Sequence, residues 1–288
     1  MTQQTPTTAP ETQPETGEGE RKLHLLSRSE FMTLLIGGGA SFVLAATLAQ
    51  PLDTFARQIL ESEPTGSGHG EGDSTHSWAM VIDLSKCIGC DYCVWACQAT
   101  NDTRDDMRWN IHIEDVTPLG NTFHVTRPCL HCRHAPCTEV CPVGATYVRA
   151  DGLVIMDYDK CIGCRYCQTA CPYGARSFNF TERSDVNPRV PEWNTPEVAR
   201  RPRGVVEKCT FCRHRIDAGL AAGLMPGVDE TATPACINVC PVNARFFGDL
   251  NDPLSPVSRM LDTHPTIRLR EDLGTEPRVY YIPPEGLV

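Results

Sequence analysis

Residues 83–97 read Asp-Leu-Ser-Lys-Cys-Ile-Gly-Cys-Asp-Tyr-Cys-Val-Trp-Ala-Cys, and residues 157–171 read Asp-Tyr-Asp-Lys-Cys-Ile-Gly-Cys-Arg-Tyr-Cys-Gln-Thr-Ala-Cys. The two stretches begin 74 residues apart and share the first Asp, the Lys, the Ile, the Gly, the Tyr and the Ala as well as all four cysteines. In both, the cysteines are spaced C-x2-C-x2-C-x3-C. The sequence therefore indicates an internal duplication that is organised around cysteine.

The remaining eight cysteines form a second repeated pair of motifs. Cys-Leu-His-Cys-Arg-His at 129–134 matches Cys-Thr-Phe-Cys-Arg-His at 209–214, and Val-Cys-Pro-Val occurs at both 140–143 and 239–242. The spacing is C-x2-C-x4-C-x3-C in motif two and C-x2-C-x23-C-x3-C in motif four, where an insertion lengthens one gap. All sixteen cysteines thus fall into four motifs of four, and the chain is a duplicated unit of two motifs.

Three kinds of chemistry use cysteine in this way: disulfides, structural zinc and iron-sulfur clusters. Zinc binds four thiolates from two C-x2-C pairs but has no use for a third cysteine two residues further on. Disulfides between such closely spaced cysteines would need crowded local bridges. The C-x2-C-x2-C-x3-C spacing is that of the bacterial ferredoxin motif, whose fourth cysteine binds the neighbouring cluster. At four ligands each, sixteen cysteines predict four [4Fe-4S] clusters.

Several residues beside the cysteines fit this prediction. Gly89 and Gly163 allow the backbone to approach a cluster and point amide groups at its sulfide, although a plain tight turn would also use glycine. Because the sets of cysteines are complete, we expect the nearby histidines to lie at the surface or around the ligands without binding iron: His131, His134 and His214. Five nearby arginines are candidates to offset the negative charge of the clusters, with ordinary surface positions as the alternative: Arg133, Arg165, Arg176, Arg213 and Arg245.

The first 77 residues differ in composition from the rest. Residues 1–30 combine an acidic tail rich in Thr, Pro and Gln, which we expect to be disordered, with a short basic flank. Residues 31–50 include the uncharged stretch 31–49, whose 19 residues are about the length of one membrane crossing, and predict either an export signal or a retained membrane anchor. Residues 27–32 resemble the twin-arginine export motif, with Ser29 in place of the second arginine. Residues 51–77 are predicted to be a flexible linker.

The predicted compact domain spans residues 78–250 and is followed by an extended C-terminal tail, residues 251–288. Within the domain we expect short strands at 79–84, 147–149, 153–156 and 244–247, and a helix at 91–98. Asp151-Gly152 predicts a hairpin turn between two of these strands. Residues 181–206 contain four prolines and predict a long irregular connection, either a docking surface or simply a tolerated length of chain.

Composition excludes some functions. Of 288 residues, 26 are Lys or Arg and 36 are Asp or Glu, a formal charge of −10, and no basic cluster predicts nucleic-acid binding. The sequence shows no nucleophile motif, paired general bases or nucleotide-binding glycine loop. We therefore expect no substrate turnover by this chain alone.

Residues 78–250 resemble the four-cluster ferredoxin-like iron-sulfur subunits of the molybdopterin oxidoreductase superfamily, such as those of dimethyl sulfoxide, polysulfide and tetrathionate reductases. Cys-Pro-Tyr-Gly-Ala-Arg at 171–176 and Glu-Lys-Cys-Thr-Phe-Cys at 207–212 look especially like that family. The resemblance implies an α+β fold of tandem bacterial-ferredoxin-like units, two 2[4Fe-4S] modules with long connecting loops. It also implies that motif one pairs with motif four and motif two with motif three.

The same resemblance implies four ligand sets, named here in order. The first quartet is Cys87, Cys90, Cys93 and Cys240. The second quartet is Cys97, Cys209, Cys212 and Cys236. The third quartet is Cys129, Cys132, Cys137 and Cys171. The fourth quartet is Cys141, Cys161, Cys164 and Cys167.

The implied function is electron transfer in a membrane-bound respiratory oxidoreductase, between a molybdopterin catalytic subunit and a polytopic quinone-reactive membrane subunit. The alternative is a quinol-oxidising assembly of the alternative complex III type, which passes electrons to a cytochrome or copper protein. The hydrophobic segment at residues 31–50 and the long connecting loops argue against a third possibility, a free-standing soluble ferredoxin. The positive flank of residues 31–50 predicts the extracytoplasmic face of the membrane, with the cytoplasmic face as the alternative. The sequence does not indicate the substrate or the direction of electron flow.

Overall fold

The computed structural model describes residues 75–287, which belong to the second of two compact units, residues 66–288. The predicted tail (1–30), the predicted signal or anchor (31–50) and nearly all of the predicted linker (51–77) lie outside the described residues. Between residues 75 and 287, no helix is both long enough and apolar enough to cross a bilayer.

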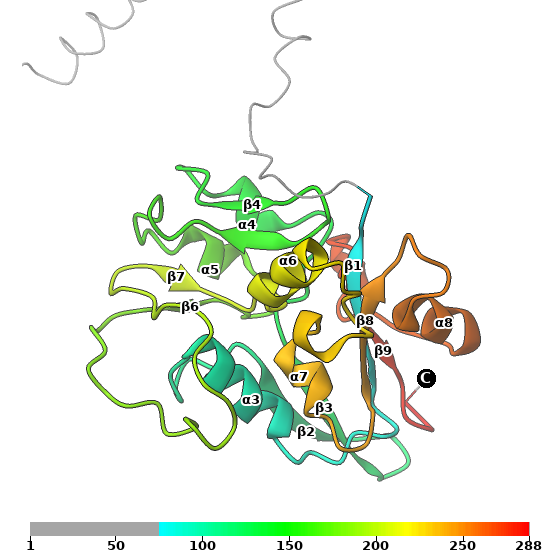
Figure 1. Cartoon of the computed structure of the whole chain (residues 1–288). Helices are drawn as coiled ribbons and strands as arrows, with labels where there is room; N and C mark the ends of the chain where they lie inside the picture. The colour runs from blue at the N-terminus through cyan, green and yellow to red at the C-terminus, as the bar shows by residue number, and fades with distance from the viewer. Residues whose placement is uncertain (1–74, 288) are drawn as a thin grey trace, which may run out of the picture. The chain divides into compact units, whose positions relative to one another are not determined.

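Short elements alternate with the cysteine loops along the described residues (Figure 1). The strands are β1 (Trp78–Asp83), β2 (Ile111–Val116), β3 (Thr122–Arg127), β4 (Thr146–Val148), β5 (Val154–Met156), β6 (Ser177–Phe178), β7 (Val206–Glu207), β8 (Arg245–Asp249) and β9 (Val279–Ile282). The helices are α3 (Tyr92–Asn101), α4 (Pro136–Glu139), α5 (Tyr166–Ala170), α6 (Arg213–Ala221), α7 (Ala235–Asn238) and α8 (Pro256–Thr263), with 3-10 turns η1 (Glu230–Ala232) and η2 (Glu271–Leu273). The described part is thus α+β, as predicted.

Strand pairing joins the motifs in the order one with four and two with three. β1, which precedes motif one, pairs antiparallel with β8, which follows motif four. β4 and β5, which separate motifs two and three, form an antiparallel hairpin of their own. The helices agree, because α3 packs against α7 and α4 packs against α5. Each pair of motifs therefore forms one ferredoxin-like unit.

Most of the predicted elements are present within one or two residues. The predicted strand at 79–84 is β1, the predicted helix at 91–98 is the start of α3, and the strand at 244–247 is β8. The predicted hairpin is β4–β5, with Gly152 at a φ of 85° in its turn. Only glycine adopts this backbone conformation at little cost, which is why the Asp-Gly pair indicates the turn.

Residues 251–287 differ from the extended tail that the sequence predicts. They contain α8, η2 and β9, and β9 pairs in parallel with β1 to complete the three-stranded sheet β8-β1-β9. In Figure 1, α8 lies beside this sheet. Val257 of α8 packs with Ala79 and Val81 of β1 and with Ile282 of β9. The prolines that suggest a tail stand at the edges of these elements, with Pro256 at the start of α8.

The cysteines lie inside the main core. Trp78, Met80 and Phe247 of the three-stranded sheet, with Leu153 and Ile155 of the hairpin, are fully buried. The same hydrophobic cluster includes cysteines of all four quartets. The apolar core and the buried cysteines therefore form one continuous interior, so the side chains that exclude water from the fold also exclude it from the buried thiols.

Candidate functional site

All sixteen cysteines lie within the described residues, and none of them forms a disulfide. The structure also brings the predicted quartets together. One cavity is lined by all four cysteines of the first quartet, with Gly89 and Arg245. Another is lined by all four cysteines of the fourth quartet, with Gly163 and Val206. The residues that line each cavity come from two motifs, as expected of paired ferredoxin units.

The second and third quartets are brought together in the interior. Burial, followed by the charges of Cys209, Cys212 and Cys236, raises the pKa of the Cys97 thiol well above its usual value. Burial also raises the pKa of Cys132 to about 12, and the charges of Cys129, Cys137 and Cys171 act in the same direction. In both cases the three cysteines that act most strongly on the thiol are the other members of its predicted quartet.

The quartets follow one another in numerical order. Cys93 of the first quartet acts electrostatically on Cys97 of the second. Cys209 of the second interacts likewise with Cys129 of the third. Arg176 interacts with both Cys137 of the third quartet and Cys167 of the fourth. Successive quartets thus lie next to one another, and the four groups of cysteines form a row within the described residues.

Burial varies along this row. All four cysteines of the second quartet are buried, as are three of the four in the third. Only one cysteine is buried in each of the first and fourth quartets, and Cys164 of the fourth is exposed. The two ends of the row therefore approach the surface, while its centre is enclosed by protein.

The backbone around the thiols repeats between the two units. Gly89 and Gly163 have φ values of 68° and 71°, and the next helix in each unit begins after a residue with a similar positive φ, Asp91 at 63° or Arg165 at 64°. Backbone amides also donate to thiol sulfur: the amide of Ala145 to Cys141 at 3.2 Å and that of Ala244 to Cys240 at 3.3 Å. Such amide bonds favour a charged sulfur, so the loops have the shape and polarity that a bound cluster needs.

Two of the five predicted arginines reach the cysteines. Arg176 is buried and donates to the sulfur of Cys137 at 2.9 Å and to Thr146 at 2.8 Å. Arg245 is buried and donates to the sulfur of Cys236 at 3.6 Å and to the hydroxyl of Thr126. Each stands five residues after the last cysteine of its motif, so the duplication places them equivalently.

The other three arginines lie elsewhere. Arg133 is exposed and 3.7 Å from Glu276, Arg165 lies over the rings of Phe178 and Phe180, and Arg213 begins α6. For these three, the alternative of ordinary surface positions fits the contacts better than charge compensation at sulfur. Nearness in sequence did not distinguish them from Arg176 and Arg245, because burial depends on the fold.

The predicted histidines behave differently from one another. His134 and His214 lie toward the surface and pair with Glu276 and Glu197. His131 is instead completely buried, and its ring stacks on Phe211 with centroids 3.8 Å apart. Burial, followed by the charge of Lys208, lowers the pKa of His131 well below its usual value.

Two polar residues near the cysteines were not predicted. Asn101 at the end of α3 is buried, and its Nδ2 lies 3.7 Å from the sulfurs of both Cys97 and Cys212. Asn110 is also buried, and its side chain acts to lower the pKa of the Cys93 thiol. A lone asparagine outside the cysteine motifs gives no signal in a single sequence.

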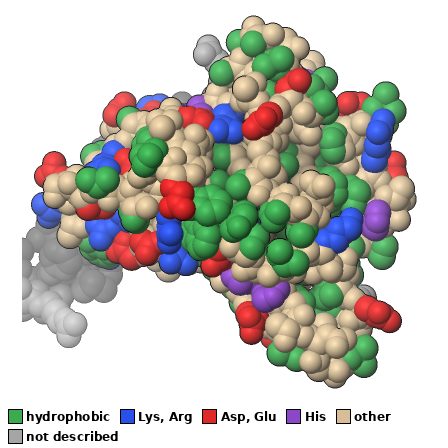
Figure 2. Space-filling view, turned by 60° about the horizontal axis from the view of Figure 1, so that its bottom comes forward, with side chains coloured by type: hydrophobic (Ala, Val, Ile, Leu, Met, Phe, Trp, Pro, Cys, Tyr) green, Lys and Arg blue, Asp and Glu red, His purple; other side chains and the backbone are tan. Residues whose placement is uncertain are grey.

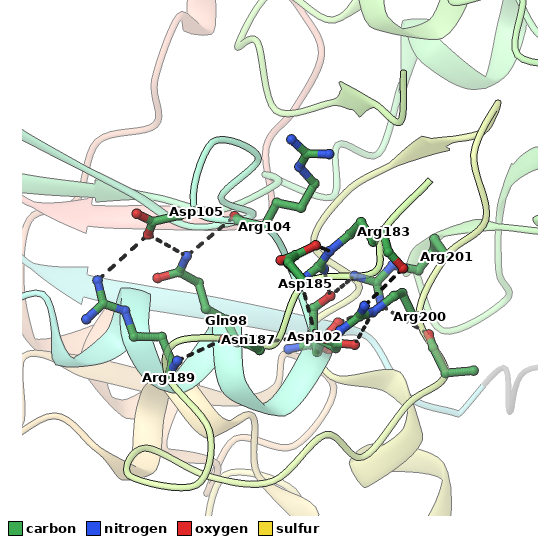
Figure 3. Close-up of polar contacts among 12 residues, drawn as sticks. Gln98, Asp102, Arg104, Asp105, Arg183, Asp185, Asn187, Arg189, Arg200 and Arg201 are labelled. Carbon is green, nitrogen blue, oxygen red and sulfur yellow. Dashed lines mark hydrogen bonds and ion pairs between the residues drawn. The ribbon is translucent and has the colours of Figure 1, made fainter. Parts of the chain in front are cut away.

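The long connection, residues 181–206, is fastened to the end of α3 by a polar network (Figure 3). Asp102 accepts hydrogen bonds from Arg200 at 2.8 Å and from Asn187 at 3.2 Å, and it lies 3.5 Å from Arg183. Arg201 donates to the carbonyl oxygen of Asn101 at 2.5 Å. The connection therefore covers the residues that support the second quartet.

Comparison with known proteins agrees with this geometry. The 4Fe-4S dicluster domain is matched over residues 121–186 and, by a second family model with the same description, over residues 160–244. The 4Fe-4S binding domain is matched over residues 80–99. These three matches between them include all sixteen cysteines.

Complete proteins are similar over most of their length. The sequence is 38% identical to the iron-sulfur subunit of the arsenate respiratory reductase of a Shewanella species, over 70% of this chain and 94% of the relative. It is 36% identical to a chain of the polysulfide reductase of Wolinella succinogenes, over 72% of this chain and 94% of the relative. This protein belongs to the family of iron-sulfur subunits of the molybdopterin oxidoreductases. An iron-sulfur subunit of this kind transfers electrons and carries [4Fe-4S] clusters, so both of these predictions are confirmed.

A further relative broadens the family. This chain is 35% identical to iron-sulfur subunit 1 of an Hdr-like menaquinol oxidoreductase of Archaeoglobus fulgidus, over 89% of this chain and 98% of the relative.

Within residues 75–287 of this chain, no three His, Cys, Asp or Glu side chains are arranged to bind a single metal ion.

Proposed function

We propose that this chain conducts electrons between a molybdopterin catalytic subunit and a quinone-reactive membrane subunit, with each of the four quartets binding one [4Fe-4S] cluster. When bound, the clusters supply one-electron carriers. The observation that best supports this proposal is the burial along the row, because the inner quartets are enclosed while the outer two reach the surface. Such a row accepts an electron at one end and delivers it at the other.

The surroundings of the outer quartets support exchange with partner proteins. Ile88, between two cysteines of the first quartet, is 58% exposed, and Ile162, its equivalent in the fourth, is 63% exposed. Tyr166 and Phe180, both 62% exposed, lie in the same unit as the fourth quartet. Figure 2 shows hydrophobic side chains gathered on one face with charged side chains around them. Exposed apolar side chains of this kind are typical of binding surfaces.

We further propose that the assembly lies on the extracytoplasmic side of the membrane, with residues 31–50 as its export signal or anchor. The support is the sequence alone: an uncharged segment of membrane length that follows basic residues. The same interpretation makes residues 51–77 the linker to a folded domain that starts at residue 78.

The experiment that tests the proposal is metal and haem analysis of the intact complex, isolated from membranes through this subunit. The expected result is molybdenum or tungsten in an amount equal to that of the subunit, together with about sixteen iron atoms per chain. A complex with c-type haem but neither metal would replace the proposal with the quinol-oxidising alternative, which the menaquinol oxidoreductase relative makes a specific second candidate. Purification of the subunit from the soluble fraction without any partner would contradict both.

A further inference from the structure

Lys208 is a completely buried lysine at the centre of the molecule. Its Nζ donates a hydrogen bond to the carbonyl oxygen of Val154 and another to that of Cys209, at 2.8 Å for the second. Val154 belongs to the unit formed by motifs two and three, whereas Cys209 belongs to motif four. The amine therefore lies where the two ferredoxin-like units meet. Among the described residues, no carboxylate forms an ion pair with it.

The junction around Lys208 joins equivalent positions of the duplicated units. His131 and Phe211 each directly precede the second cysteine of their motif, both have positive φ values, 44° and 54°, and their rings stack. His131 accepts a hydrogen bond at Nδ1 from the amide of Val154 at 3.0 Å, which leaves its ring proton on Nε2 and the ring neutral. Lys208 therefore supplies the positive charge at this junction.

The charged neighbours of Lys208 are thiols of the two central quartets and the guanidinium group of Arg176. Lys208 interacts electrostatically with Cys209 of the second quartet and with Cys129 and Cys137 of the third. The hydrogen bond to the carbonyl oxygen of Cys209 places the amine beside the second quartet. Val154, whose carbonyl oxygen also accepts from the amine, donates its amide to His131, which directly precedes Cys132 of the third quartet. A buried cation at this position lies between two negatively charged clusters.

Lys208 completes a pattern formed with the two buried arginines. Arg245 interacts with Cys93 of the first quartet and Cys236 of the second. Arg176 interacts with Cys137 of the third quartet and Cys167 of the fourth. Each junction between successive quartets thus contains one buried cation. The duplication accounts for the two arginines, whereas Lys208 lies at the junction between the two units and has Pro128 as its counterpart before Cys129.

We propose that Lys208 is a positioning residue that sets the reduction potentials of the two central clusters through its buried positive charge. The inference rests on the ligand sets of the proposed function. Reduction adds a negative charge to a cluster, and a nearby cation in a low-dielectric interior stabilises that charge. Lys208 therefore raises the potentials of the second and third clusters together, which favours the presence of the electron at the centre of the row whichever end it enters.

The test is a redox titration of the intact complex followed by electron paramagnetic resonance, with iron content measured on the same samples. Lys208→Met removes the charge and keeps the length of the side chain. We expect the reduction equilibrium constants of two clusters to fall about tenfold, which is about 59 mV for a one-electron step. The other two clusters and the iron content should stay as in the unchanged complex.

Two further variants make the result specific. Lys208→Gln keeps a hydrogen-bond donor for the carbonyl oxygens but has no charge, so it should shift the same two clusters in the same direction. Lys160→Met is the matched control, because Lys160 also directly precedes a cysteine, Cys161, but is exposed and pairs with Asp157 at 3.3 Å. Water screens such a charge, so we expect less than about a twofold change at any cluster.

The outcomes separate this inference from the function on which it rests. The electrostatic role is wrong if the unchanged complex carries four clusters but neither Lys208 variant shifts a reduction potential. It is also wrong if Lys208→Met shifts the potentials and Lys208→Gln does not. In both cases the ligand sets stand. If both Lys208 variants lose iron, Lys208 holds the fold together and does not act through its charge. A complex with fewer than four clusters before any substitution would overturn the ligand sets and this inference with them.

Discussion

Gly89 and Gly163 occupy equivalent positions in the two units but have different neighbours. A Cβ atom added at Gly163 would lie 2.2 Å from the carbonyl oxygen of Gly204, which is backbone and has little freedom to move. At Gly89 the nearest atoms belong to the His124 ring, at 2.7 Å, and a side chain near the surface can turn away. Both positions have positive φ, so an alanine would introduce similar backbone strain at either of them.

We therefore expect Gly163→Ala to lower iron content by about one cluster in four, while Gly89→Ala retains nearly all of it. Iron and sulfide analysis of the purified complexes measures this directly. Equal losses in the two variants would mean that φ strain alone decides the outcome and that the contact with Gly204 is unimportant.

The residue scale also shows what the sequence predicts and what it does not. The cysteine motifs, with the pairing that the family resemblance implies, predict the four groups in which the thiols lie, and the glycine between the first two cysteines of motifs one and three predicts a tight loop. Lys208 and His131 stand beside cysteines in the same way as the exposed Lys160 and His134. Only the packing of two distant segments buries the first pair, so their roles follow from the fold and not from the local sequence.

At the scale of elements, residues 181–206 depend on Asp102. Asp102 and Arg183 are nearly inaccessible to solvent, at 8% and 3% of their side-chain surface, whereas Asp185 is 58% exposed. Removal of one partner from a buried ion pair leaves the other charged groups without compensation, which destabilises the folded structure by about 3 kcal/mol. An exposed pair contributes less than about 1 kcal/mol.

Asp102→Ala should therefore increase local opening of residues 181–206, with amide hydrogen exchange there about a hundredfold faster. Asp185→Ala is the matched control, because it removes the other carboxylate that pairs with Arg183, and it should change exchange less than about fivefold. Exchange followed by mass spectrometry on the anaerobic complex resolves this segment. Unchanged exchange in Asp102→Ala would show that the contacts of Trp193 with Tyr92 and Trp95 hold the connection by themselves.

Elements with a local signal were predictable, and elements stabilised by distant partners were not. The hairpin β4–β5 has its turn residues in the sequence, and β1 has six consecutive buried residues in a strand-like stretch. β9 has only four residues, and it lies in the sheet because β1, which comes far earlier in the sequence, offers it an edge. A single sequence contains no signal for that pairing.

For the whole molecule, the cysteines and the apolar core form one interior. Removal of iron would leave sixteen thiols in four groups that are mostly buried or half-buried, and burial already raises the pKa of those at Cys93 and Cys212 to about 11. Their packing depends on the group that binds them, because a cluster holds residues from both ends of the domain together.

We expect chelation of iron under anaerobic conditions to abolish most of the ellipticity of the isolated domain in the far ultraviolet, in one step with the loss of the visible cluster absorbance. Circular dichroism and absorbance recorded on one sample compare the two. Loss of the absorbance with secondary structure unchanged would show that the hydrophobic cluster around Trp78 and Phe247 is sufficient for folding.

The central position of β1 in its sheet also determines the order in which the fold can form during synthesis. Both of its neighbours, β8 and β9, leave the ribosome long after it, and the last ligand of the first quartet, Cys240, comes equally late. Until then the mostly apolar strand Trp78–Asp83 has neither partner, and an unpaired strand of this kind is prone to aggregate. The nascent chain therefore exposes an unpaired apolar strand through most of its synthesis, and its first quartet is complete only when translation is nearly finished.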